Sequence, residues 1–176
     1  MEEIEIKILD VNEKEIKGRI MSFGAKKTAN ELIIEKYYDF DDGRISKNKG
    51  LFRLRKAGEK IEFAYKIVKN TGKDFLEFEE YETKVDDFDI MEIIIDKLGF
   101  KCIINRQKKR ITFAINKLKF EIHKYPTIPA YLEIEGTKEE IIKFLKLLNY
   151  KMEDTTSMTD TDILKFYKKD YAFQKF

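Results

Sequence analysis

Cysteine, proline, histidine and tryptophan are scarce or missing in this chain. Its 176 residues include one cysteine, Cys102, two prolines, one histidine and no tryptophan. A lone cysteine excludes an internal disulfide and favours a reducing compartment. The sequence also lacks a signal peptide and any apolar run of membrane-spanning length. We therefore expect a cytoplasmic protein that has no membrane partner.

An excess of one charge sign is missing as well. Charged residues make up 39% of the chain, yet the formal net charge is only +2. Nearly equal numbers of both signs argue against a disordered tail and against a general nucleic-acid-binding surface. Hydrophobic residues reach 43%, with 14 Phe and 9 Tyr, which suits a packed core. The length and the lack of a Gly/Ser linker predict one domain over residues 1–176.

The spacing of apolar residues predicts strands and helices in alternation. Strands or hairpins are expected over residues 1–7, 31–42, 50–70, 74–85, 102–125 and 130–136. Helices are expected within residues 11–27, with Gly24 as the stop, and over residues 87–100, 137–150 and 161–171. Asn12 and Thr137 are expected as N-caps, with Glu140 completing a capping box at Thr137. Asp160 or Thr161 is expected to cap the last helix.

A pattern that occurs three times runs through these elements. Each copy has a Glu-x-Glu strand, then an amphipathic helix, then a Gly or Asn that ends the helix, such as Gly24 or Gly99. The Glu pairs are Glu3/Glu5, Glu80/Glu82 and Glu133/Glu135. The sequence leaves open whether the pattern is a structural repeat or a coincidence.

Alternation places apolar residues on one face of each strand and charged residues on the other. The charged positions hold Glu3, Glu5, Lys7, Arg53, Arg55, Glu62, Lys66, Glu80, Glu82, Arg106, Lys108, Arg110, Glu121, His123, Glu133 and Glu135. Such a face commonly meets water, but solvent faces usually carry Thr, Ser and Gln, whereas here like charges cluster by strand. Like charges repel unless an opposite ion lies between them. The pattern therefore favours a barrel with this face inward, where carboxylates bind hard metal ions and Arg and Lys bind phosphates.

The stretch "EIEIK" at residues 3–7 resembles the ExExK signature that opens CYTH-domain proteins, also called triphosphate tunnel metalloenzymes. Further elements follow in family order and resemble its Arg-x-Arg strand, the next lysine, the central Glu-x-Glu strand, the Lys-x-Arg strand and the closing Glu-Ile-Glu. They are Arg53 and Arg55, Lys66, Glu80 and Glu82, Lys108 and Arg110, and Glu133 and Glu135. The resemblance covers nearly the whole chain. The family includes class IV adenylate cyclases and thiamine triphosphatases.

The resemblance implies an α+β fold, an eight-stranded antiparallel β tunnel with a polar lumen, flanked by helices. It implies that Mg²⁺ or Mn²⁺ is bound by Glu3, Glu5, Glu133 and Glu135. It implies that a triphosphate is bound by Lys7, Arg53, Arg55, Lys66, Lys108 and Arg110. Glu5 and Lys7 would be catalytic. Glu80 and Glu82 would have a secondary role, as ligands of a second ion or as partners that orient the basic side chains.

The single histidine departs from the family pattern. His123 stands where many relatives have an Asp, twelve residues before the last Glu of the closing strand. It could ligate Mn²⁺, act as a base with a pKa near neutrality, or simply be tolerated at the tunnel mouth. The preference of Mg²⁺ for oxygen ligands favours the last interpretation.

The expected function is metal-dependent processing of a triphosphate, either cyclisation of ATP to cyclic AMP and pyrophosphate or hydrolysis. A phosphate-binding module without turnover is the main alternative, but a pure anion binder gains nothing from the extra glutamates. A nucleic-acid binder is a third option, suggested by the basic run "NRQKKR" at residues 105–110. Half of that run would point inward and no aromatic platform accompanies it, so we expect no nucleic-acid partner. The oligomeric state, including a homodimer, stays open.

Overall fold

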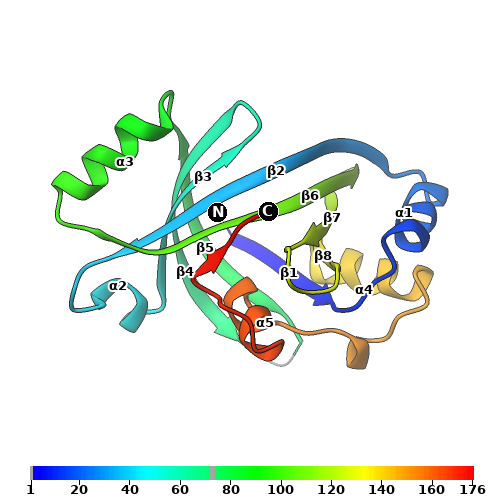
Figure 1. Ribbon diagram of the computed structural model, residues 1–176. Coiled ribbons are helices and arrows are strands. Elements are labelled where there is room, and N and C mark those ends of the chain that lie inside the picture. The colour runs from blue at the N-terminus through cyan, green and yellow to red at the C-terminus, as the bar shows by residue number, and fades with distance from the viewer. Residues whose placement is uncertain (1, 72–73) are drawn as a thin grey trace.

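In the computed structural model, which describes residues 2–71 and 74–176, eight antiparallel strands close into a barrel (Figure 1). The strands are β1 (Glu2–Ile8), β2 (Lys26–Asp39), β3 (Gly50–Ala57), β4 (Lys60–Thr71), β5 (Leu76–Lys84), β6 (Lys101–Ile115), β7 (Leu118–Lys124) and β8 (Tyr131–Glu135). Their order around the barrel is β2-β3-β4-β5-β1-β8-β7-β6, and β6 pairs back to β2. The predicted eight-stranded tunnel is confirmed. Residues 1, 72 and 73, which the expected single domain includes, lie outside the described residues.

The barrel is closed by its two longest strands. The β2–β6 ladder runs from Lys26 opposite Ala114 to Asp39 opposite Lys101. The predicted stop of the first helix at Gly24 is confirmed, whereas the prediction that the next strand begins only at residue 31 was wrong. The backbone of Gly24 adopts a left-handed conformation with a φ of 88°, which ends the helix. The ladder to β6 then stabilises the following residues as strand, although their local sequence is lysine-rich.

Five helices lie outside or at the end of the barrel. They are α1 (Glu13–Ser22), α2 (Arg44–Lys47), α3 (Phe88–Lys97), α4 (Lys138–Leu147) and α5 (Asp160–Phe166). The caps at Asn12 and Thr137 are confirmed. The predicted cap of the last helix was wrong, because the Thr159 hydroxyl accepts from the Asp162 amide at 3.2 Å and the Asp162 carboxylate accepts from the Thr159 amide. Asp160 is thereby left free for another role. Helix α2, the 3₁₀ turn Met152–Asp154 and strand β9 (Phe173–Gln174) were not expected.

The pattern that occurs three times corresponds to structure. Its strands are β1, β5 and β8, each followed by a helix, and they lie side by side in the order β5-β1-β8. The three helices are followed by Gly24, Gly99 and Asn149, all of which have positive φ angles. The repeat therefore places three Glu-x-Glu pairs on adjacent strands of one wall.

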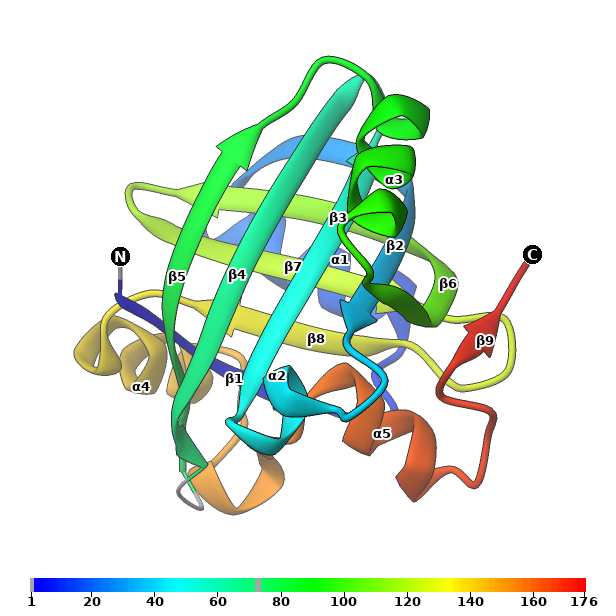
Figure 2. The same cartoon turned by 90° about the vertical axis from the view of Figure 1, so that its left-hand side faces the viewer.

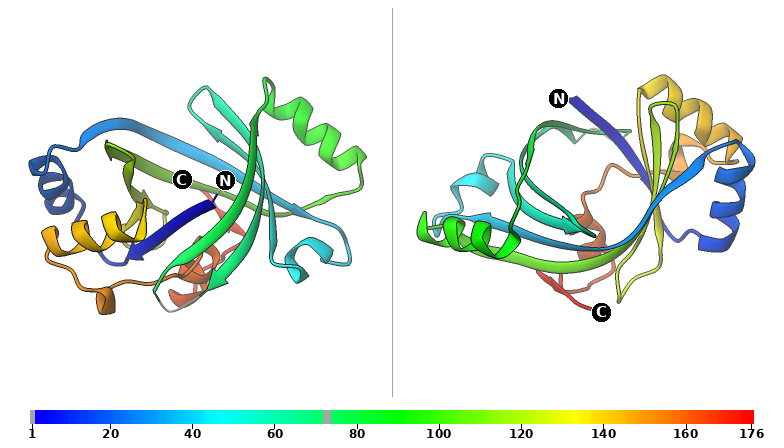
Figure 3. Two further views of the ribbon diagram at one scale, coloured as in Figure 1. Left: turned by 180° about the vertical axis from the view of Figure 1, so that it is seen from behind. Right: turned by 90° about the horizontal axis from the view of Figure 1, so that it is seen from above.

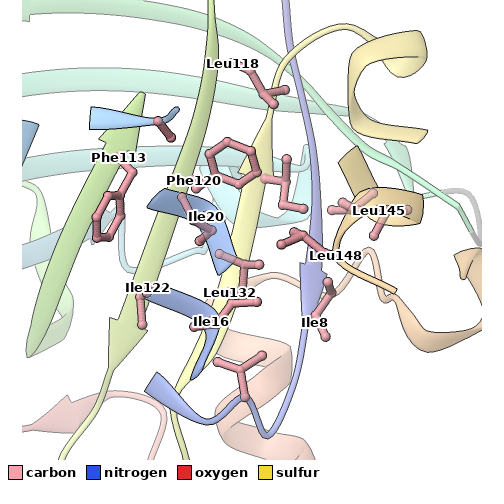
Figure 4. Packing of buried hydrophobic residues seen from close by; sticks show 14 of the residues in the cluster. Ile8, Ile16, Ile20, Phe113, Leu118, Phe120, Ile122, Leu132, Leu145 and Leu148 are labelled. Atoms are coloured by element: carbon pink, nitrogen blue, oxygen red, sulfur yellow. The ribbon is translucent and has the colours of Figure 1, made fainter. Parts of the chain in front are cut away.

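The outer face of β1, β6, β7 and β8 is covered by α1 and α4 (Figures 1 and 4). Ile20 of α1 and Leu145 of α4 pack with Phe120 and Leu132, and all four are at most 1% exposed. This apolar cluster fixes which strand face is outside, because a shift of one residue in register would bring charged side chains under the helices.

Helix α3 packs on the outer face of β2, β3 and β4, away from α1 and α4 (Figure 3). Its Ile95 is fully buried and packs against Leu54 and Tyr38. Helix α5 lies at the lower end of the view in Figure 2, and its Ile163 and Leu164 pack with Tyr125, Tyr131 and Ile128. The helices do not cover the whole outer face, since Leu32 and Tyr81 remain 44% and 58% exposed.

Replacing Leu132 by Ala should lower the free energy of unfolding by about 2–5 kcal/mol, because the lost side chain leaves a cavity in the outer cluster. Leu32→Ala is the matched control, since Leu32 is 44% exposed, and it should change stability by about 0.5 kcal/mol or less. Urea unfolding of both variants measures this difference. Equal losses for the two variants would contradict the described packing.

Candidate active site

The charged faces of the strands meet inside the barrel. On β1, Ile4, Ile6 and Ile8 belong to the outer apolar cluster, so the alternate residues Glu3, Glu5 and Lys7 face the lumen. The charged side chains there are strongly buried. Lys7 is 2% exposed and Glu5 5% exposed. Charges buried to this degree must be paired to remain ionised, and the lumen is organised into three groups of such pairs.

The first group lies where β1 pairs with β8. Lys7 stands opposite Glu133, and Glu5 stands opposite Glu135. The Lys7 ammonium contacts the Glu5 carboxylate, and its Nζ lies 3.1 Å from Glu133 Oε2. Lys119 Nζ lies 2.9 Å from Glu135 Oε1. Three of the four predicted metal ligands, Glu5, Glu133 and Glu135, are therefore neighbours across one ladder.

Negative charge exceeds positive charge in this first group. Burial and the charge of Glu133 raise the pKa of Glu5 to about 8, although Lys7 opposes them. Burial also raises the pKa of Glu135; Lys119 opposes this rise without cancelling it, and Glu3 and Glu133 add to it. Carboxylates that resist ionisation because of one another are typical of a site that gains from a bound cation.

The second group joins β1, β3, β4 and β5. Lys66 Nζ lies 2.5 Å from Glu3 Oε2 and 3.2 Å from Glu80 Oε1. Arg55 donates to Glu62 at 2.6 Å from Nη2 and at 2.9 Å from Nε, and it approaches Glu82 at 3.3 Å.

Arg53 belongs to the same group. Its Nη2 lies 3.4 Å from Glu82 Oε2 and 3.5 Å from Glu80 Oε1. Glu80 and Glu82 thus contact the basic residues predicted as phosphate ligands.

The third group lies where α5 meets the barrel, and apart from the predicted phosphate ligand Lys108 its members were missed as site residues from the sequence. Arg106 Nε donates to Glu35 Oε1 at 2.7 Å, and Lys108 Nζ donates to Asp160 Oδ2 at 2.5 Å. The hydroxyl of Tyr125 lies 3.0 Å from both Glu35 and Asp160. Burial alone would raise the pKa of Glu35, but Lys108 and Arg106 outweigh it and lower that pKa to about 2. These carboxylates stay ionised because cations surround them.

The sequence held weak signals for these missed residues. Glu31, Ile33, Glu35 and Tyr37 alternate on β2, but Ile33 interrupts the charged face. Asp160 directly follows the true N-cap Thr159, and its role becomes visible only once the capping box is assigned to residues 159–162.

His123 lies in the wall between the first group and Arg110. Its Nε2 is 3.4 Å from Glu121 Oε2 and 3.8 Å from Glu133 Oε2. Arg110 in turn lies 3.4 Å from both Glu121 and Glu31. The interpretation of a histidine tolerated at an open mouth does not fit, because His123 is 1% exposed. Burial and Lys108 would lower its pKa, but Glu133 and Glu121 raise it above the usual value.

The donors in this wall fit a divalent metal ion. One ligand atom each from Glu121, His123 and Glu133 can lie within 4.8 Å of the others. Within the described part of the chain, neither imidazole nitrogen of His123 has a hydrogen-bond partner. Burial would raise the pKa of Glu121, but His123 and Arg110 lower it. Burial would also raise the pKa of Glu133, but Lys7 and His123 lower it, so both carboxylates stay ionised and available as ligands. The carboxylate-rich set is one that Mg²⁺ and Mn²⁺ use in proteins.

The sequence matches the CYTH domain over residues 1–167, so the chain belongs to the CYTH domain family. The PH1012 protein of Pyrococcus horikoshii OT3 is 28% identical, with a TM-score of 0.77 over 89% of this chain and 96% of that chain. A candidate adenylate cyclase of Vibrio parahaemolyticus has the same fold, with a TM-score of 0.81 at 13% identity over 93% of this chain and 97% of that chain.

HpAC1 from Hippeastrum, a candidate adenylyl cyclase with a dominant triphosphatase activity, has a TM-score of 0.65 at 17% identity. That alignment covers 96% of this chain and 97% of HpAC1. No curated protein sequence matches this chain. Helices of a length and apolarity that would cross a bilayer do not occur among the described residues.

The pKa of Glu5 predicts a pH dependence of stability in metal-free protein. Its folded-state pKa of about 8 lies above the ordinary 4.5, so the stabilisation is complete below pH 4.5 and is lost as pH rises towards 8. Glu5→Gln lacks this loss. Its melting temperature relative to wild type should rise by roughly 6–16 °C from pH 5 to pH 8, because the wild type loses about 3–4 kcal/mol over this range and about 1 kcal/mol moves the midpoint by about 2–4 °C at this size. Thermal melts in chelator measure the difference, and a constant offset across this range would contradict the raised pKa.

Proposed function

We propose that this chain is a divalent-metal-dependent hydrolase of a compact triphosphate, which binds inside the barrel. The observation that carries the proposal is the series of buried cations along one lumen, each held by carboxylates rather than by solvent. The proposed triphosphate ligands are Lys7, Arg53, Arg55, Lys66, Lys108 and Arg110. A triphosphate carries about four negative charges, so it can replace carboxylates such as Glu82 as the partner of these groups.

The proposed metal ligands are Glu3, Glu5, Glu133 and Glu135. A bound Mg²⁺ or Mn²⁺ would neutralise phosphate charge and polarise the attacking water. Glu5 and Lys7 are the proposed catalytic residues. In this proposal Glu5, beside the attacking water, would orient that water and polarise it together with the metal. The Lys7 ammonium stabilises the charge that develops on the phosphoryl oxygens.

Hydrolysis is favoured over cyclisation by the third group. Tyr125 and Tyr131 are at most 1% exposed, and their hydroxyls donate to Asp160. Their rings are therefore not available there to stack on a nucleobase. The triphosphatase activity of HpAC1, a protein of the same fold, supports this choice. The expected single domain, a cytoplasmic location and the absence of a nucleic-acid partner belong to the same proposal.

The deciding experiment incubates the full chain with tripolyphosphate, ATP or thiamine triphosphate, each with Mg²⁺, with Mn²⁺ and with chelator. Phosphate, pyrophosphate and cyclic AMP are quantified separately. We expect metal-dependent phosphate release. Cyclic AMP with pyrophosphate from ATP would instead identify a class IV cyclase, and tight binding without turnover would identify a binding module. Either result would overturn the proposed hydrolysis.

Glu135→Gln should abolish metal-dependent turnover, with a fall of at least about 100-fold in kcat, because a charged metal ligand is lost. The fold should survive, since removing a carboxylate from the crowded first group relieves repulsion. Steady-state kinetics and circular dichroism check both points. Glu153→Gln is the control, because Glu153 is 74% exposed and its variant should keep wild-type kinetics. Full activity in Glu135→Gln would remove this residue from the metal site.

Arg55→Ala should raise the barrier in kcat/KM by about 2–4 kcal/mol, because a charge-assisted contact to phosphate is lost in a partly dry lumen. Arg44→Ala is the matched control, since the Arg44 side chain is 62% exposed. In wild type, tripolyphosphate should raise the melting temperature, and it should do so less in Arg55→Ala. An unstable Arg55→Ala variant with normal kinetics would make Arg55 a structural partner of Glu62 and Glu82.

A further inference from the structure

We propose that Glu121, His123 and Glu133 form a mixed nitrogen and oxygen metal centre that selects Mn²⁺ or Co²⁺ over Mg²⁺. The inference rests on the proposed function and deepens it by naming the class of ion; of the proposed metal ligands it keeps Glu133, and it adds Glu121 and His123 from β7. Its test is a binding measurement that requires no turnover.

The three donors converge from two adjacent strands. Glu121 and His123 lie two residues apart on β7 and face the same side, and Glu133 stands opposite Glu121 on β8. Ligand atoms of the three residues can lie within 4.8 Å of one another. Three protein donors fill only part of the coordination sphere of a divalent ion, so positions remain for water or phosphate oxygens.

The unsatisfied imidazole is the independent observation. His123 is 1% exposed, and neither ring nitrogen has a hydrogen-bond partner among the residues that the structure describes. Buried polar groups are almost always satisfied by protein, water or an ion. Nε2 is the nitrogen that lies near Glu121 and Glu133, at 3.4 and 3.8 Å. These separations are too long for good hydrogen bonds but suit donors arranged around one ion.

The imidazole is also held in position for ligation. Its ring stacks on Tyr131 with centroids 5.0 Å apart and planes 16° apart. The Tyr131 hydroxyl donates to Asp160 at 2.8 Å, so the stacking partner is itself fixed. A ligand held in this way loses little freedom when it binds a metal.

The donor chemistry determines the preference. Mg²⁺ demands oxygen ligands and near-ideal octahedral geometry, whereas imidazole suits first-row transition ions. The competing arrangement is a protonated His123 that bridges Glu121 and Glu133 as a buried cation and binds no metal. Only in the proposed centre is an imidazole nitrogen of His123 bonded to a metal ion.

His123 is the only histidine in the chain, so an untagged protein gives an unambiguous signal. The full chain, freed of metal by chelator, is loaded with Mn²⁺ alone and studied by pulsed EPR for nitrogen coupling. Mg²⁺, Mn²⁺ and Co²⁺ affinities are measured by calorimetry without substrate. The variants are His123→Asp, which restores an all-oxygen set, and Glu153→Gln as the exposed control.

We expect nitrogen coupling in wild type and at least about 10-fold tighter binding of Mn²⁺ and Co²⁺ than of Mg²⁺. His123→Asp should lose the nitrogen coupling, and its ratio of Mn²⁺ affinity to Mg²⁺ affinity should be about 10-fold lower than that of wild type. Glu153→Gln should change neither the coupling nor this ratio. Absence of nitrogen coupling in loaded wild type, or an unchanged preference in His123→Asp, would overturn the inference. If His123→Asp does not fold, the wild-type spectrum still decides. If Mn²⁺ binds with nitrogen coupling but no triphosphate is hydrolysed, only the proposed hydrolysis is refuted. If the protein hydrolyses triphosphate with Mg²⁺ but bound Mn²⁺ shows no nitrogen coupling, only this metal centre is refuted.

Discussion

The pairing of buried charges inside the barrel is the constraint on which the rest of the structure depends. An ionised side chain without a partner is costly in a lumen from which most water is excluded. Each basic group there lies against carboxylates, as Arg106 does with Glu35 and Lys66 with Glu3. An anion that binds the basic groups displaces their carboxylate partners. It is accepted only if those carboxylates find new positive partners. In the proposed function, a triphosphate together with a metal ion would supply both, since the phosphates would pair with the cations and the metal with the carboxylates. A free anion would supply only one.

The apolar outer face makes this interior possible. Ile6, Leu132 and Phe120 alternate with lumen residues on their strands and are held against α1 and α4. Because the side-chain period of a strand is two, the outer cluster fixes the direction of every inner residue at once. The stability of the protein thus comes from the helix–sheet contacts, while the lumen can keep charges that favour binding over stability. The like-charge neighbours Glu5 and Glu135 show this division most clearly.

The features that depend on residue alternation and on local helix caps could be predicted from the sequence. The inward faces of β1, β3 and β4, the barrel and the cap at Thr137 all follow from short-range pattern. The beginning of β2 did not, because Lys26 and its neighbours become strand through a ladder to β6, far along the chain. Asp160 and Glu35 were also missed, since the partners of each, Lys108 and Arg106, come from other elements. The ligand roles of the predicted site residues stay predictions, because charge pairing describes the state before any ligand binds.

The C-terminal segment completes what the strands leave open. β1 pairs with β5 only over its first residues, and beyond that point the backbone of Lys7 bonds in both directions to Thr156. β6 extends beyond the end of β7, and there Asn105 and Arg106 pair with β9. A closed barrel of unequal strands leaves such unpaired edges, and one returning segment satisfies both. The same return brings Asp160 to Lys108, so backbone closure and charge compensation are met by the same stretch of chain. The opening strand and the last helix are therefore parts of a single site, because the cations of the lumen remain compensated only when both are in place.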